Sequence, residues 1–213
     1  MAWGRQRSET PTQKQRRVWD KAAPAYDKQM RLMERVLLGG GREWLAERAR
    51  GHVLEVAIGT GLNLHHYDTD VRLSGVELSP EMLALARERA ASLGRDVELY
   101  EGDAEQLPFP DAAYDTVVCA LALCSIPDQE RAIAEMKRVL VPGGRLLLLD
   151  HVDSTFRPLY AVQWLFERLT VRFAGEYFTR RQLPLVESAG FEVVERDRLK
   201  AGIVERIHAV KPG

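Results

Sequence analysis

The stretch VLEVAIGTGLN, residues 53–63, decides the fold of this chain. Its apolar run from Val53 to Ile58 predicts a buried strand, and Gly59-Thr60-Gly61 predicts a sharp turn directly after it. Glycine adopts backbone angles that other residues avoid, and it lets a ligand come close to the backbone. We expect a helix to begin near Leu62, with its unpaired N–H groups beside the turn. Alone, the turn is weak evidence for a binding site, because tight structural turns use the same residues.

Strands and helices alternate along the rest of the chain. Apolar runs predict strands at residues 53–58, 72–78, 97–101, 113–120, 145–150, 191–198 and 203–210. Helical spacing predicts helices within residues 13–50, with a break at residues 39–41, and at residues 79–93, 128–140 and 156–173. We expect Ser79 to cap the helix at residues 79–93, Pro142-Gly143-Gly144 to end the helix at residues 128–140, and Thr179 to cap a last helix that ends at Gly190.

These units predict an α/β fold with a doubly wound sheet. Five strand–helix units followed by a hairpin give a sheet that is largely parallel, with one antiparallel strand. Ligands of such sheets bind outside the C-terminal ends of the strands. We expect a flexible N-terminus at residues 1–12 and one domain over residues 13–213. Its parts are N-terminal helices (13–50), a ligand-binding core (51–150), a helical insert (151–180) and a C-terminal helix with a hairpin (181–213).

Composition narrows the class of protein. A net charge of −1, from 30 basic and 31 acidic residues, argues against nucleic acid as a main partner. Two cysteines, Cys119 and Cys124, cannot build a disulfide framework or a four-cysteine zinc site, and they fit a cytoplasmic protein. No apolar run reaches the about 18 residues of a membrane-spanning helix, and we expect no signal peptide.

Two carboxylates follow the expected strands after the glycine turn. Glu77 ends the second strand, where a carboxylate can accept hydrogen bonds from both hydroxyls of a ribose. Asp103, followed by Ala104, ends the third strand and can accept from the exocyclic amine of an adenine. Leu78 and Met82 can enclose the ring. The three elements together predict a site for an adenosine-containing ligand.

The segments VLEVAIGTG, GVELSPEML, EGDAEQLPFPDAAYDTVV and EMKRVLVPGGRLLLLD, in this order, resemble class I S-adenosylmethionine-dependent methyltransferases of the type 11 small-molecule group. The resemblance covers roughly residues 15–195. It implies a Rossmann-like, seven-stranded sheet whose last strand is antiparallel, with the N-terminal helices as a lid. It also implies S-adenosyl-L-methionine as methyl donor and S-adenosyl-L-homocysteine as product.

The resemblance carries over residue by residue. Glu55, Gly59 and Gly61 match the glycine-loop motif beside the amino-acid half of the donor, Glu77 matches the ribose-binding acid, and Asp103 with Ala104 matches the adenine side. Ala57 stands where the family usually has a glycine. We expect no metal site. With their neighbours, the expected cofactor-binding residues are Tyr26, Glu55, Ala57, Gly59, Gly61, Asn63, Glu77, Leu78, Met82, Asp103, Ala104 and Ala120.

The sequence does not identify the molecule that accepts the methyl group. VVCALALCSIPDQERAIAEMKRVLVPGG followed by LLLLDHV resembles mammalian thiol S-methyltransferases and also bacterial phospholipid and quinone-pathway methyltransferases. We expect a small, partly apolar acceptor, with a thiol as the leading candidate. Nitrogen of a phospholipid, or oxygen or carbon of a quinone or natural product, is the alternative. Peripheral contact with lipid, and a monomer or a homodimer, are consistent with this interpretation.

Methyl transfer needs alignment and a dry site more than it needs acid–base groups. His151 with Asp150, at the end of the fifth strand, is the candidate general base, although an Asp-His pair there serves equally well as a cap. Tyr177 is the third catalytic candidate, and Tyr26 belongs to the lid. The aromatic residues of the insert either cover the site or pack as an ordinary helix face, which their spacing favours. They are Phe156, Tyr160, Trp164, Phe166, Phe173, Tyr177 and Phe178.

Two other classes of function fit a glycine turn after a strand. A nicotinamide-dependent oxidoreductase would place a third glycine at residue 64, which is Leu64 here. A relative of this fold that binds the cofactor without catalysis would keep the same motifs.

Overall fold

The computed structural model describes residues 9–34, 38–173 and 177–213. Apolar runs form the strands, as expected. The strands are β1 (His52–Val56), β2 (Arg72–Glu77), β3 (Val97–Glu101), β4 (Tyr114–Ala120), β5 (Leu140–His151), β6 (Glu192–Leu199) and β7 (Val204–Val210). The helices are α1 (Pro11–Met33), α2 (Gly41–Arg48), α3 (Pro80–Ser92), α4 (Gln129–Val139), α5 (Arg157–Phe173) and α6 (Leu183–Ser188).

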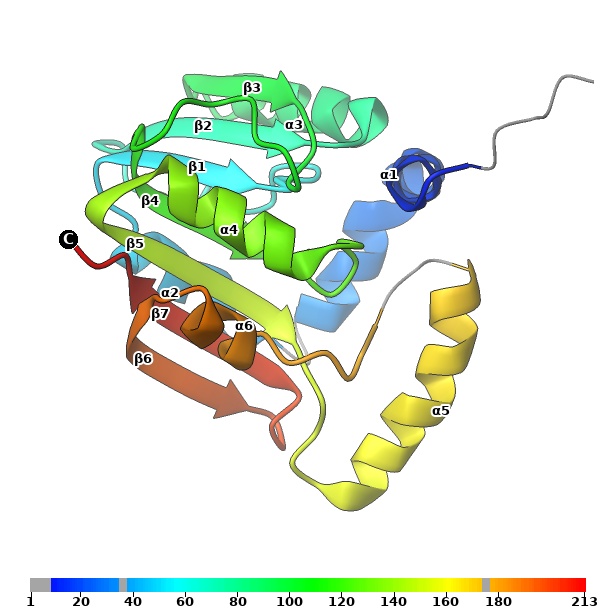
Figure 1. Ribbon diagram of the computed structural model, residues 1–213. Coiled ribbons are helices and arrows are strands. Elements are labelled where there is room, and N and C mark those ends of the chain that lie inside the picture. Colours follow the sequence, from blue (N-terminus) through cyan, green and yellow to red (C-terminus); the bar gives the residue numbers. More distant parts are fainter. Residues whose placement is uncertain (1–8, 35–37, 174–176) are drawn as a thin grey trace, which may run out of the picture.

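The strands form one seven-stranded sheet in the order β3-β2-β1-β4-β5-β7-β6 (Figure 1). Strand β1 pairs in parallel with both β2 and β4. Strand β7 is antiparallel to both β5 and β6. The predicted doubly wound sheet with an antiparallel last strand is therefore confirmed. The chain reverses its direction across the sheet between β1 and β4, which is where such folds bind ligands.

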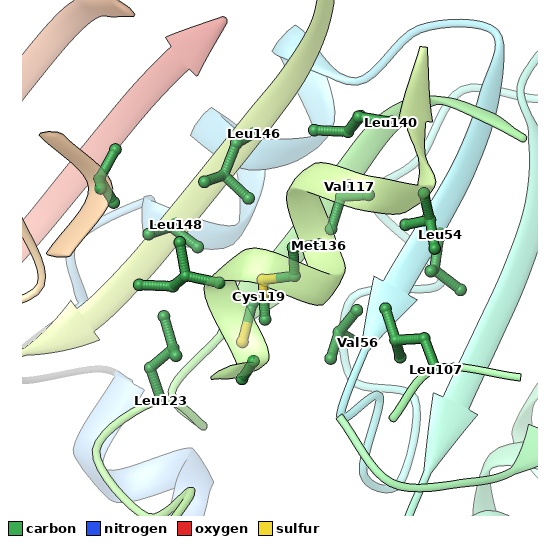
Figure 2. Close-up of a cluster of buried hydrophobic side chains, with 14 of the residues drawn as sticks. Leu54, Val56, Leu107, Val117, Cys119, Leu123, Met136, Leu140, Leu146 and Leu148 are labelled. Atoms are coloured by element: carbon green, nitrogen blue, oxygen red, sulfur yellow. The ribbon is translucent and has the colours of Figure 1, made fainter. Parts of the chain in front are cut away.

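Helices cover both faces of the sheet because alternate residues of the central strands point to opposite sides. Leu146 and Leu148 of β5 belong to the cluster on the side of α4, whereas Leu147 and Leu149 belong to the cluster on the side of α2 and α3. Figure 2 shows Met136 of α4 among side chains of the neighbouring strands. Residues 146–149 of β5 are all apolar because both faces of this strand are buried.

The caps of α1 and α3 follow their sequences. The Ser79 side chain accepts a hydrogen bond from the Met82 N–H at the start of α3, as predicted. Thr10 and Gln13 form a reciprocal capping box, so α1 begins at Pro11. Residues 11 and 12, expected to be flexible, therefore belong to a helix. Residues 1–8 of that expected flexible segment lie outside the described part of the chain.

Two helix boundaries differ from the expectation. Helix α4 ends at Val139, and Pro142-Gly143-Gly144 lies within β5, so it does not end the helix. Helix α6 begins at Leu183, and its cap is not Thr179. The Thr179 N–H and hydroxyl both donate to the Glu167 carboxylate of α5, and the cap position of α6 is Gln182.

Helix α5 lies apart from the sheet and turns one side to solvent (Figure 1). Two polar side chains of it bind the segments before and after the helix. The Gln163 amide binds backbone groups of Val152 and Ser154, and Glu167 accepts from the N–H groups of Phe178 and Thr179. The expectation of ordinary packing is wrong for most aromatic residues of this segment: the exposed ones are Phe156, Tyr160, Trp164 and Phe166. The side chain of Phe173 lies outside the described part.

Within the described residues, no helix combines the length and the apolar character that crossing a membrane requires.

Candidate active site

A pocket lies under α1 at the C-terminal ends of β1, β2 and β4, at the point where the chain reverses direction across the sheet. We call it the donor pocket. Ten of the expected cofactor-binding residues line it: Tyr26, Glu55, Ala57, Gly59, Glu77, Leu78, Met82, Asp103, Ala104 and Ala120. Gly61 and Asn63 do not. Trp19, expected with Tyr26 in the lid, also lines it, and so do residues that sequence reasoning missed, among them Thr12, Gln15, Arg42, Thr60, Leu121, Ser125 and Ile126.

The two glycines of the turn have different roles. Both have positive φ angles, +58° for Gly59 and +78° for Gly61, which favour glycine. A Cβ atom at Gly59 would meet no protein atom within 4 Å, whereas one at Gly61 would lie 2.8 Å from the Leu64 Cδ1. Gly59 therefore presents open backbone to the donor pocket. Gly61 is required for packing against the buried Leu64.

No helix follows the glycine turn, so the expectation of a helix near Leu62 is wrong. Residues 62–66 form successive turns. Asn63 Nδ2 donates to Glu55 Oε1 at 2.7 Å, and the Tyr67 hydroxyl donates to Glu55 Oε2 at 2.9 Å. These two bonds hold the segment back against β1. The donor pocket therefore has no helix dipole behind the glycine turn.

Glu55 is buried beneath the donor pocket, and burial raises its pKa to about 7 despite the hydrogen bonds from Tyr67 and Asn63. The same Asn63 side chain accepts from Arg42 Nη1 at 2.6 Å. Arg42 Nε in turn donates to Glu34 Oε1 at 2.6 Å. Asn63 thus acts on the site through its neighbours, because it fixes both Glu55 and Arg42.

Arg42 brings a buried positive charge to the donor pocket, with only 8% of its side chain exposed. It stands at the start of α2, directly after the glycines that separate α2 from α1. In the sequence, Arg42 is marked only by its position directly after the three glycines. The neighbouring residues do not indicate that its side chain points toward the sheet.

Glu77 holds the glycine turn and the start of α3 together. Its Oε2 accepts from the Gly59 N–H and its Oε1 from the Ser79 N–H, both at 2.9 Å. Burial raises the Glu77 pKa, and these backbone hydrogen bonds oppose the shift. A carboxylate offers about four lone-pair positions, so Glu77 keeps the capacity to accept a hydrogen bond from a ligand. Nearby, Asp103 Oδ1 accepts from the Glu105 N–H at 2.9 Å, which fixes the loop after β3.

Helix α1 closes over the donor pocket and is bonded to its rim. The Thr60 hydroxyl donates to Asp27 at 2.7 Å, and the Ser79 hydroxyl donates to Asp20 at 2.6 Å. Tyr26 packs edge to face against Trp19, and burial raises the pKa of its hydroxyl. Gln15 is also buried in this wall, and its Nε2 has no hydrogen-bond partner among the described residues.

Two residues of the wall have left-handed backbones although they are not glycine. Ala57 follows β1 with φ +54°, and Leu121 follows β4 with φ +55°. Such conformations cost on the order of 1–3 kcal/mol and concentrate at functional sites. Ala57 is the position at which the resemblance expects glycine, and its backbone adopts the angle that glycine would favour.

The three catalytic candidates lie beside the donor pocket and not in its wall. Asp150 is 1% exposed, and its two oxygens accept from the N–H groups of Cys124 and His151 at 3.0 and 2.8 Å. The His151 ring stacks on Phe178 with 4.5 Å between centroids, and its buried Nδ1 has no partner among the described residues. Tyr177 donates its N–H to the Cys124 carbonyl at 3.2 Å.

Cys124, Asp150 and His151 bring ligand atoms within 4.8 Å of one another, a set of donors that could hold a metal ion. The sequence analysis did not anticipate this cluster, because Cys124 joins the other two only through the loop after β4. Both Asp150 oxygens already accept backbone hydrogen bonds, so the carboxylate ties that loop to the end of β5.

Comparison with known proteins agrees with this geometry. A family model described as a methyltransferase domain matches residues 54–148. Phosphatidylethanolamine N-methyltransferase of Cereibacter sphaeroides is 36% identical, over 71% of this chain and 75% of that protein. The ubiquinone/menaquinone biosynthesis C-methyltransferase UbiE of Pseudomonas savastanoi pv. phaseolicola is 31% identical, over 92% of this chain and 88% of that protein.

A solved structure shares the fold. The SAM-dependent methyltransferase TM1293 of Thermotoga maritima superposes with a TM-score of 0.69 at 24% identity, over 92% of this chain and 99% of that one. The strand order, the pocket at the switch point and the relatives lead to the same assignment. This chain belongs to the class I S-adenosylmethionine-dependent methyltransferases.

Proposed function

We propose that this protein transfers the methyl group of S-adenosylmethionine to a small, partly apolar organic acceptor. The observation that carries the proposal is the donor pocket itself. It brings the open backbone of Gly59, the carboxylate of Glu77 and the Asp103-Ala104 pair to one cavity at the switch point of the sheet.

The polar groups of this pocket fit the donor. Gln15 Nε2 is buried in the wall without a partner and can donate to an acceptor atom of the nucleoside. Glu77 keeps lone pairs for the ribose hydroxyls, and Asp103 lies at the adenine end. Arg42 has five N–H donors, of which the described acceptors on Glu34 and Asn63 take two. Its remaining donors can bind the carboxylate of the methionine half.

When bound, S-adenosylmethionine supplies an activated methyl group on a sulfonium, and the chain supplies position and a dry environment. Trp19 and Tyr26 of α1 cover the pocket, and Leu121 and Ile126 extend its apolar wall. These side chains exclude water from the nucleophile of the acceptor, which favours the displacement. No base is needed for an acceptor that arrives deprotonated. For one that arrives protonated, His151 remains the candidate.

Among the described residues, no contact favours sulfur over other acceptor atoms, so the thiol expectation gains no support. One relative is named for N-methylation of phosphatidylethanolamine and another for C-methylation in ubiquinone/menaquinone biosynthesis. We therefore place nitrogen, carbon or oxygen of a lipid-soluble acceptor ahead of a thiol.

Calorimetric titration with S-adenosylhomocysteine, compared with NAD, tests the donor assignment. We expect S-adenosylhomocysteine to bind with one site per chain and NAD not to bind. Tighter binding of NAD would overturn the proposal in favour of an oxidoreductase. Transfer of label from methyl-labelled S-adenosylmethionine to a panel of amines, phenols and thiols then tests catalysis. Donor binding without transfer to any of them would contradict an enzymatic role.

A further inference from the structure

A second cavity of about 220 Å³ lies between α5 and the ends of β5 and β7. We call it the α5 cavity. Val162 and Phe166 of α5 form one side of it. His151, Phe178 and Ile203 form part of the other side. None of these residues lines the donor pocket.

The chemistry of the α5 cavity selects an apolar occupant. Its polar side chains are Gln163 and His151, and the Gln163 amide already bonds Val152 and Ser154 at 3.0 and 2.7 Å. His151 presents its ring stacked on Phe178, and its buried Nδ1 lacks a partner among the described residues. For scale, an engineered apolar cavity of about 150 Å³ stays dry and binds benzene. The α5 cavity is larger, so it has room for a hydrocarbon group.

Leu121 connects this cavity to the donor pocket, because it lines both. Its left-handed backbone is fixed by a hydrogen bond from its N–H to the Leu149 carbonyl at 2.7 Å. The residues on either side, Ala120 and Ala122, line the donor pocket only. Leu121 is therefore the wall that the donor pocket and the α5 cavity share.

We propose that the α5 cavity binds the hydrocarbon chain of the methyl acceptor. The acceptor is then an amphiphile whose polar head, carrying the atom to be methylated, lies at Leu121 while its chain extends under α5. This inference rests on the proposed function and adds the class of substrate to it. The buried, unpartnered His151 nitrogen marks where a polar atom of the acceptor can be received.

A series of 4-n-alkylphenols, from butyl to octyl, tests the proposal by calorimetric titration of the protein saturated with S-adenosylhomocysteine. Burial of each methylene contributes about fourfold in affinity, so we expect the dissociation constant to fall about fourfold per methylene until the cavity is filled. The same affinity for butylphenol and octylphenol would overturn the inference.

A matched pair of variants locates the binding. Val162 and Leu165 lie on the same helix and are both 63% exposed, but only Val162 lines the α5 cavity. We expect Val162→Trp to fill the cavity and abolish the dependence on chain length, and Leu165→Trp to keep it. An unchanged dependence in Val162→Trp would refute the assignment. S-adenosylhomocysteine should bind both variants with the affinity of the parent. A loss of this binding would show that the donor site is at fault and not the α5 cavity.

Discussion

Replacing Gly59 and Gly61 one at a time by alanine distinguishes a glycine needed for ligand binding from a glycine needed for packing of the protein. Both residues have positive φ angles, so each alanine pays about 1–2 kcal/mol for a left-handed backbone. At Gly61 the new Cβ lies 2.8 Å from Leu64 Cδ1, and Leu64 is buried, so overpacking adds about 1–3 kcal/mol. At Gly59 the new Cβ meets no protein atom within 4 Å, and Gly59 lines the donor pocket, so we expect the added methyl group to conflict with the proposed donor.

We therefore expect Gly61→Ala to lower the free energy of unfolding by about 2–5 kcal/mol and Gly59→Ala by about 1–2 kcal/mol. For the affinity of S-adenosylhomocysteine, we expect the larger loss in Gly59→Ala. Gly59→Ala should weaken S-adenosylhomocysteine at least about tenfold, the effect of about 1.4 kcal/mol of steric conflict, while folded Gly61→Ala binds nearly as the parent does.

Urea unfolding measures the first quantity, and calorimetric titration with S-adenosylhomocysteine measures the second. The reasoning would be refuted if Gly59→Ala bound the ligand as tightly as the parent, or if Gly61→Ala lost affinity without losing stability. Either result would mean that the donor approaches the backbone somewhere other than at Gly59.

Three further predictions concern the polar groups of the donor pocket. Glu77→Ala should weaken both S-adenosylhomocysteine and adenosine by about 1.5–3 kcal/mol, the scale of hydrogen bonds to a charged group; unchanged titrations of the folded variant would contradict the ribose contact. Arg42→Met should weaken S-adenosylhomocysteine by a similar amount but leave adenosine, which has no carboxylate, unaffected; equal losses for both ligands would argue against a carboxylate contact. Glu55 has its pKa raised from 4.5 to about 7 in the folded protein, so folding binds a proton in this range and stability falls as pH rises through it. Relative to Glu55→Gln, the parent should lose about 2.5 kcal/mol of unfolding free energy between pH 5 and pH 8 in urea titrations, and a difference that stays constant with pH would show that Glu55 is already ionised at pH 5.

The sheet could be predicted because its determinants are local. Apolar runs such as residues 145–150 mark buried strands, and the Ser79-Pro80 pair marks the start of α3. The acids at the ends of β2 and β3 could be placed for the same reason, since the C-terminal ends of neighbouring parallel strands meet at one edge.

The remaining features depend on contacts between distant residues. Glu55 holds Asn63 and Tyr67, and their bonds replace the helix that the local sequence favours after Gly61. Glu167 of α5 binds the N–H and the hydroxyl of Thr179, and α6 begins only at Leu183, after Gln182. Arg42 enters the donor pocket from a helix that precedes β1, and only the packing of α2 against the sheet places it there. No spacing rule along the chain encodes such pairings.

Helix α5 is attached to the protein mainly by Gln163 and Glu167, while Trp164, Leu165 and Leu169 face solvent. Detaching it breaks few apolar contacts, so the free energy of this local opening is far below that of global unfolding. Its amide protons will therefore exchange with deuterium long before those of β1 and β4, whose neighbours are strands on both sides. The wall of the α5 cavity is thus the part of this chain that can be displaced and restored while the sheet stays intact.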